Sequence, residues 1–148
     1  MNTISRHLLC LGALAGLLSA CGSGSGLPGI IPTVSITSPS NNSSVLLSGN
    51  KQIAINFESN YVLKAPGTCE GLANCGHIYL LVDNTSCNQP NMPYNALVVA
   101  SPAQADLNRC TTATGQHTIT LELHHDDGTP VKNLVDNPVL SQVTVTAQ

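Results

Sequence analysis

The sequence predicts an all-β protein that folds as an antiparallel β-sandwich of about seven strands. Apolar and polar residues alternate with a period of two in several short segments, as expected for strands with one buried face. Gly, Pro and Asn separate these segments and mark turns. Beyond residue 20, no window shows a sustained helical period. The 128 residues after that position are enough for one domain with a core and too few for two.

Two strands are expected in the first half of this domain. Residues 33–37 alternate, and the turn-forming cluster Ser38-Pro39-Ser40-Asn41-Asn42 ends that run. Residues 52–57 alternate again and place Ile53, Ile55 and Phe57 on one face. Since Trp is absent and Phe57 is the only phenylalanine, the core must be built from aliphatic and β-branched side chains.

Four further strands are expected at residues 77–83, 96–100, 117–125 and 139–146. The clearest core faces are Ile78, Leu80 and Val82 in the first of these and Ile119, Leu121 and Leu123 in the third. The connections 59–76 and 84–95 are longer than a minimal sandwich needs. We expect them to be either decoration held by disulfides or a binding rim.

The start of the domain carries a motif that narrows the fold. Pro32-Thr33-Val34-Ser35-Ile36-Thr37-Ser38-Pro39 resembles the opening of many bacterial immunoglobulin-like domains. This resemblance implies an immunoglobulin-like antiparallel β-sandwich over residues 33–148. It says little about activity, because the motif is common across bacterial surface proteins.

The first 20 residues have the features of a cleaved, helical signal peptide. Arg6 and His7 form a short polar region, and residues 8–18 form an apolar run. That run is too short to span a bilayer, which needs roughly 20 apolar residues. The leader ends in Leu18-Ser19-Ala20-Cys21, which resembles a bacterial lipobox. The resemblance implies that Cys21 becomes the lipidated first residue of a membrane-anchored lipoprotein carrying acyl chains such as palmitate.

The residues after the lipobox predict a flexible tether and the cellular location of the protein. Residues 21–32 are rich in Gly, Ser and Pro, a composition typical of a flexible linker between an anchor and a domain. Gly22 follows Cys21 where enterobacterial lipoproteins retained in the inner membrane carry aspartate. We therefore expect the bacterial cell envelope as the location, and the outer membrane if the host has two membranes.

The charge composition limits the classes of partner. Only 9% of the residues are charged, and the chain after residue 20 carries four basic and eight acidic side chains. No basic patch is available for phosphates, so nucleic acid is not expected as a partner. The expected partners are the membrane, through Cys21, and an envelope protein or glycan.

Four cysteines remain once Cys10 leaves with the leader and Cys21 is acylated. An exported domain sits in an oxidising compartment, where cysteines pair. We favour the disulfides Cys69–Cys75, closing a short loop, and Cys87–Cys110, tying two long connections together. The alternative is a zinc site, but the spacings lack the close Cys-x2-Cys pairs typical of structural zinc.

Histidines at the ends of two expected strands suggest a metal site. If 77–83 and 117–125 are antiparallel neighbours, His77 lies beside His124 and Glu122 on the face directed away from the core. Two imidazoles and a carboxylate suit Cu(II) or Zn(II). A one-residue slip reverses the face, and a polar strand cap remains the alternative. No other cofactor is expected.

The same strands resemble a family of small uncharacterised exported bacterial domains. The matching segments are Gly76-His77-Ile78-Tyr79-Leu80-Leu81-Val82-Asp83 and Gly115-Gln116-His117-Thr118-Ile119-Thr120-Leu121, with Val143-Thr144-Val145-Thr146 at the end. Members carry Gly-His-x-His-Leu-Leu-x-Asp and Gly-x-His-Thr-Leu. This chain has Tyr79 in place of the second histidine. The resemblance therefore supports the fold and weakens a metal role.

Together these features predict a lipid-anchored envelope module that binds a ligand or serves structurally. No Gly-x-Ser-x-Gly elbow is present, and paired cysteines leave no thiol for catalysis, so we expect no enzyme. The alternative function is an extracytoplasmic Cu/Zn-binding protein that uses His77, Glu122 and His124.

Overall fold

The structure, a computed structural model, describes residues 29–148, so the leader, Cys21 and most of the predicted tether lie outside the described residues. The described part contains nine strands and one short 3-10 helix. They are β1 (Val34–Ser38), β2 (Ser43–Val45), β3 (Gln52–Ser59), β4 (Val62–Leu63), β5 (Cys75–Val82), β6 (Ala96–Val98), β7 (Ala103–Asp106), η1 (Leu107–Arg109), β8 (Gly115–His125) and β9 (Leu140–Ala147). Among residues 29–148, no helix has the length and apolar character needed to cross a membrane.

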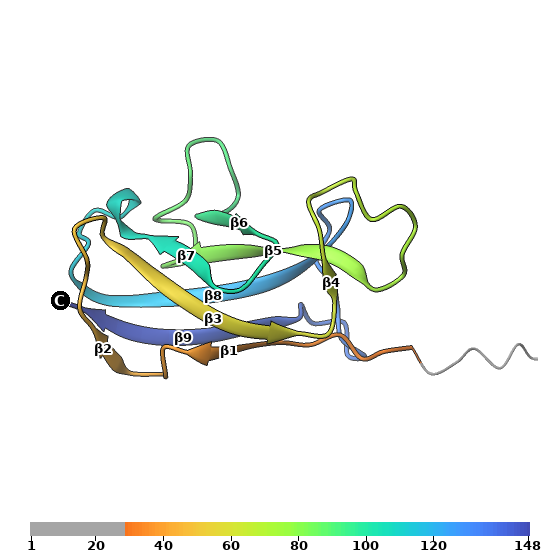
Figure 1. Cartoon of the computed structure of the whole chain (residues 1–148), viewed down its shortest axis with the longest axis horizontal. Helices are drawn as coiled ribbons and strands as arrows, with labels where there is room; N and C mark the ends of the chain where they lie inside the picture. The colour runs from red at the N-terminus through yellow and green to blue at the C-terminus, as the bar shows by residue number, and fades with distance from the viewer. Residues whose placement is uncertain (1–28) are drawn as a thin grey trace, which may run out of the picture.

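The strands form two sheets (Figure 1). One has the order β1-β3-β7, and the other has the order β2-β9-β8-β5-β4, with β6 also pairing with β5. Pairing is antiparallel except between β2 and β9 and between β4 and β5. The order matches strands A, B and E of an immunoglobulin-like sandwich facing its C′, C, F and G strands. The predicted fold class is therefore confirmed.

The core lies between the sheets and is aliphatic, as the composition requires. Ile53 and Ile55 of the smaller sheet face Ile78 and Leu80 of the larger one, and all four side chains are buried. The period-two faces expected for residues 52–57, 77–83 and 117–125 are those that the core uses. The hydrophobic pattern therefore fixed the register of the central strands.

Three strands were missed by the sequence prediction. β2 and β4 are too short to carry a periodic signal. β7 consists of Ala-Gln-Ala-Asp, whose residues have low β-propensity, so packing decides its structure. Ala103 and Ala105 pair with Ile55 and Ile53 of β3 and are buried. The sandwich therefore has nine strands where about seven were expected.

Both expected disulfides are present. Cys69 pairs with Cys75 at the start of β5, and Cys87 pairs with Cys110 just after η1. The first closes the loop between β4 and β5. The second joins the long connection after β5 to the connection that leads into β8. The two long connections are therefore pinned to the sandwich by covalent bonds.

Candidate functional site

The candidate site lies on the β5–β8 pair, where the structure places the predicted residues side by side. His77 is opposite His124, and Tyr79 is opposite Glu122. This register is the one expected from the two alternating runs. The pairing requires a close approach of the backbones: a Cβ atom on Gly76 would overlap the carbonyl oxygen of His124. A glycine before His77 therefore permits the register that brings the histidines together.

The two histidines lie on the face directed away from the core, as expected, but this face is covered. His77 is fully buried and His124 is 6% exposed, although both point away from the central core. Tyr79 stacks on His124 with a centroid distance of 3.8 Å, and Tyr94 packs on Tyr79 at 4.7 Å. The turn that contains Gly128 closes over the same face, since its carbonyl oxygen contacts His124. Loop residues thus cover a face that strand periodicity alone leaves open.

His77 is a buried polar group without a hydrogen bond. Neither ring nitrogen has a partner among residues 29–148. The ring lies beside the stacked pair of Tyr79 and His124, at centroid distances of 5.2 and 5.9 Å. Burial, and then the positive charge of His124, lower the pKa of His77, while Asp126 and Asp127 act in the opposite direction. His77 therefore resides in the fold as a neutral ring.

His124 has a defined tautomer. Its Nδ1 lies 2.8 Å from the carbonyl oxygen of Gly128, which only accepts, so Nδ1 carries a hydrogen. Its Nε2 lies 3.3 Å from Oε1 of Glu122. Because Nδ1 is bonded to the Gly128 carbonyl, Nε2 is the ring nitrogen that faces the Glu122 carboxylate. A metal-binding histidine uses this same arrangement, with one nitrogen held by a carbonyl.

The three predicted metal ligands do not converge. Within the described chain, the one group of three His, Cys, Asp or Glu residues with ligand atoms inside 4.8 Å is Asp83, Cys87 and Cys110. Its two sulfur atoms are bonded to each other in a disulfide. His77 shares a ring stack with His124, with centroids 5.9 Å apart, and does not join a common donor centre. Glu122 and His124 alone remain as a donor pair.

The covered histidines support an aromatic platform. Tyr79 and Tyr94 are both half-buried, and their rings are inclined by 50° to each other. Burial, and then the neighbouring Tyr94, raise the pKa of Tyr79, so its hydroxyl keeps its proton. Half-exposed tyrosines present an apolar ring together with a hydroxyl, a combination enriched at binding surfaces.

A surface hollow of about 500 Å³ lies at the end of β8. Leu72, His125, Asp126 and Asp127 are among its lining residues. Asp126 is fixed because its Oδ1 accepts the backbone N–H groups of Thr68 and Cys69, at 3.0 and 3.3 Å. The disulfide loop is therefore held against the β8 turn, and the hollow has an apolar wall and an acidic wall.

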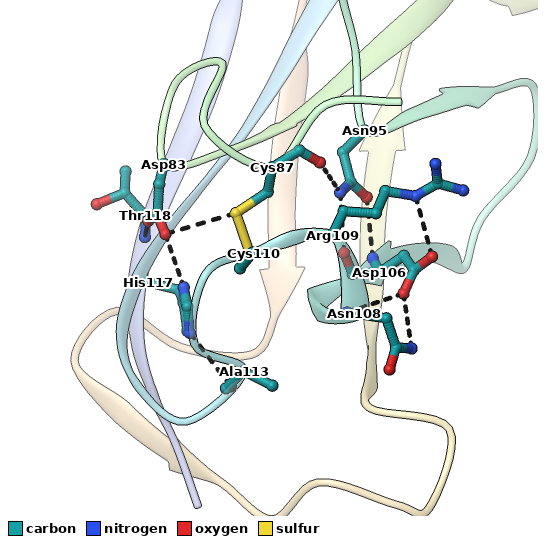
Figure 2. Close-up of a disulfide and its surroundings, with 10 residues drawn as sticks. All are labelled: Asp83, Cys87, Asn95, Asp106, Asn108, Arg109, Cys110, Ala113, His117 and Thr118. Carbon is teal, nitrogen blue, oxygen red and sulfur yellow. Dashed lines mark hydrogen bonds and ion pairs between the residues drawn. A yellow bond between two sulfur atoms is a disulfide. The ribbon is translucent and has the colours of Figure 1, made fainter. Parts of the chain in front are cut away.

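A third buried histidine, His117, lies at the opposite end of the β5–β8 pair (Figure 2). Nδ1 of His117 is 2.7 Å from Oδ2 of Asp83, and the backbone N–H of Thr118 donates to Oδ1. Sγ of Cys87 lies 3.8 Å from Oδ2 of the same carboxylate. Asp83 was expected only as the last residue of the strand 77–83, without a role in a pair. The register that pairs His77 with His124 also places Asp83 opposite Thr118, next to His117. The same alternation of residues could therefore have predicted the contact between Asp83 and His117.

Comparisons with known proteins add a likeness of overall fold. No family model matches the sequence, and no curated protein matches it. Among solved structures, the chain is similar to one described as "Structures of Clostridium thermocellum CbhA fibronectin(III)-like modules". The identity is 15% and the TM-score 0.44, over 78% of this chain and 96% of that one.

Proposed function

We propose that this protein is a lipid-anchored module of the bacterial cell envelope whose β-sandwich binds an envelope glycan or protein and catalyses no reaction. The anchor is the acylated Cys21, in the outer membrane if the host has two membranes. The lipobox-like Leu18-Ser19-Ala20-Cys21 and the Gly/Ser-rich residues after it support this part of the proposal.

The binding role is carried by the Tyr79–Tyr94 platform and by the hollow at the end of β8. Stacked aromatic rings offer flat apolar area at low entropic cost, and sugar rings present a matching C–H face. The hollow adds acidic acceptors and the exposed His125 for hydroxyl groups. A Cβ atom at Gly128 would lie 3.4 Å from the Tyr79 hydroxyl, so the turn after β8 packs against the platform.

The anchor is tested by replacing Cys21 in the full chain. Cys21→Ser should move the protein from the membrane fraction to the soluble envelope fraction, because the acyl chains on this residue supply the only firm attachment. Cys10→Ser is the matched control, since this cysteine lies in the predicted leader and its loss should change nothing. Retention of the Cys21→Ser protein in membranes overturns the anchor.

The binding role is tested by co-sedimentation of the protein with purified peptidoglycan sacculi. Binding should weaken about tenfold in Tyr94→Ser, since loss of one stacked ring costs on the order of 1 kcal/mol. Leu46→Ser is the control, because Leu46 is an exposed apolar residue on a different part of the sandwich. Equal sedimentation of the Tyr94→Ser and unchanged proteins assigns binding to another surface.

A second candidate function is binding of Cu(II) or Zn(II) by His124 and Glu122. The favouring observation is the tautomer of His124, whose Nε2 faces Oε1 of Glu122. Calorimetric titration with each metal salt should then give micromolar binding that is lost in Glu122→Gln and in His124→Phe. His125→Phe is the control because this neighbour is exposed and points elsewhere. Absence of binding heat removes this function.

A further inference from the structure

The connection between β8 and β9 carries an exposed apolar tip on a rigid base. Leu134 is 88% exposed and Val135 is 72% exposed, which makes them two of the most accessible large apolar residues of the described chain. Exposed apolar side chains that stand together commonly mark a contact surface. The tip therefore needs an explanation that the sandwich core does not supply.

The base of this connection is fully ordered by hydrogen bonds. Val131 and Val139 are buried, and the N–H of Val139 donates to the carbonyl of Val131 at 2.8 Å. Nearer the tip, Oδ1 of Asn133 accepts the N–H groups of Val135 and Asn137, at 3.0 and 3.1 Å. The hydrogen bonds of Asn133 thus fix the turn in a conformation that exposes Leu134 and Val135 to solvent.

The tip lies at the end of the molecule where the described chain begins (Figure 1). A shallow hollow is shared by Pro32, Thr33 and Val34 on one side and Asn133, Pro138 and Leu140 on the other. Ile30 and Ile31, which precede it, are 53% and 58% exposed. The residues that line this hollow are therefore adjacent in sequence to two exposed apolar pairs, Ile30 with Ile31 and Leu134 with Val135.

The length of that chain limits how far this end lies from an acyl anchor. The 12 residues from Cys21 to Pro32 span at most about 40 Å when fully extended. The charges beside the tip do not favour a charged partner, because Lys132 pairs with Asp136 at 3.0 Å. A neutral base that carries an apolar tip suits the interface of a lipid bilayer, where apolar side chains sit below the headgroups.

We propose that Leu134 and Val135, with Ile30 and Ile31, dock this end of the sandwich onto the lipid surface that holds Cys21. This inference rests on the proposed lipid anchor. Docking fixes the orientation of the domain, with β9 directed away from the membrane. The C-terminal end of β9 and Leu46 beside it then lie about 25 Å farther out, at 3.3 Å per residue along the strand.

The absence of tryptophan from the sequence allows a direct test. Leu134→Trp and Leu46→Trp each create a single-tryptophan protein, and both sites are more than 80% exposed, so neither change disturbs packing. The full chain is expressed with its leader, purified, and placed in vesicles of phosphatidylethanolamine with a minority of phosphatidylglycerol. Part of the lipid carries brominated acyl chains, which quench only tryptophan that enters the apolar layer.

Docking predicts a blue shift and a loss of emission for Leu134→Trp, and neither for Leu46→Trp. The effect should persist in high salt because it is hydrophobic. Equal, unquenched emission from both proteins overturns the inference. A blue shift without quenching also overturns it, because the tip then packs on protein, either a second copy or an envelope partner.

Mass spectrometry of the purified protein distinguishes failure of the Cys21 anchor from failure of docking by the tip. If Cys21 carries no acyl chain, the proposed anchor fails, and the tip is then tested on the chain from Cys21 onward coupled to a maleimide lipid. Coupling is selective because the other four cysteines of that chain are in disulfides. Quenching at position 134 in that sample upholds the lipid affinity of the tip, and its absence refutes it.

Discussion

Nδ1 of His117 lies 2.7 Å from Oδ2 of Asp83, and Nε2 of the same ring lies 3.2 Å from the carbonyl oxygen of Ala113. Both partners are acceptors, and Nδ1 makes the shorter of the two contacts. The ring is 3% exposed, and the carboxylate also accepts the N–H of Thr118. The His117–Asp83 contact therefore joins the end of β5 to the start of β8 beside the Cys87–Cys110 disulfide (Figure 2).

Asp83→Asn should lower the free energy of unfolding by about 1.5–3 kcal/mol, the range for a hydrogen bond to a charged group. Asn tolerates the positive φ of 49° at this position, so the change tests the charge and leaves the backbone unstrained. Urea unfolding of Asp83→Asn, His117→Gln and the double variant measures the coupling. If the two single costs simply add, the pair is not an energetic unit.

The sequence predicts the central strands well because their core faces repeat every second residue. The runs that contain Ile78 and Leu121 pair in the expected register, and this alone brought His77 to His124. The burial of His77 escaped prediction because its neighbours Tyr79 and His124 are held by Tyr94 and by the turn at Gly128, which have no periodic signal. Tertiary packing, which a single sequence leaves open, decided how accessible the site is.

Gly76→Ala should disrupt the β5–β8 pair more than any surface substitution, because its methyl group would overlap the carbonyl oxygen of His124. The strands must separate locally, which breaks ladder hydrogen bonds and opens the ring stack. A loss of about 3 kcal/mol or more is expected, in the range of severe backbone clashes and overpacking. Gly49→Ala is the control, since nothing lies within 4 Å of a Cβ there. Similar urea midpoints for the two variants would contradict the predicted clash.

His77→Phe should stabilise the protein at neutral pH by about 1–3 kcal/mol, because it removes two buried nitrogens that lack partners among residues 29–148. Burial lowers the pKa of His77, while an unfolded chain takes up the proton near pH 6.5. The unfolded state then binds more protons, so the unchanged protein loses stability as the pH falls below about 6.5.

The variant should lack this part of the pH dependence. Urea unfolding of both proteins between neutral pH and pH 5 measures the two slopes, with His125→Phe as the exposed control. Parallel slopes for the unchanged protein and His77→Phe would show that His77 gains a proton in the folded state.

Asn95→Ala should detach the 84–95 connection from β7. The buried side chain donates to the carbonyls of Cys87 and Asp106, and its Oδ1 accepts the N–H of Asp106 at 2.9 Å. Removing it leaves backbone groups unsatisfied at a cost of about 2–4 kcal/mol, since each such group costs 1–3 kcal/mol. Hydrogen exchange should show faster exchange of the Asp106 amide. An unchanged exchange rate of this amide would show that Asn95 does not hold the 84–95 connection on β7.

The two disulfides should contribute unequally to stability because they close loops of different length. Cys87 and Cys110 are 23 residues apart, whereas Cys69 and Cys75 are six apart. In the chain-entropy model the first stabilises by about 3 kcal/mol and the second by about 2 kcal/mol. Paired Cys→Ala variants, compared by urea unfolding, measure each contribution while leaving the other bond intact. A larger loss from the Cys69/Cys75 pair would mean that the disulfide acts through the folded contacts of Asp126 with the 68–69 backbone, and not through the entropy of the unfolded chain.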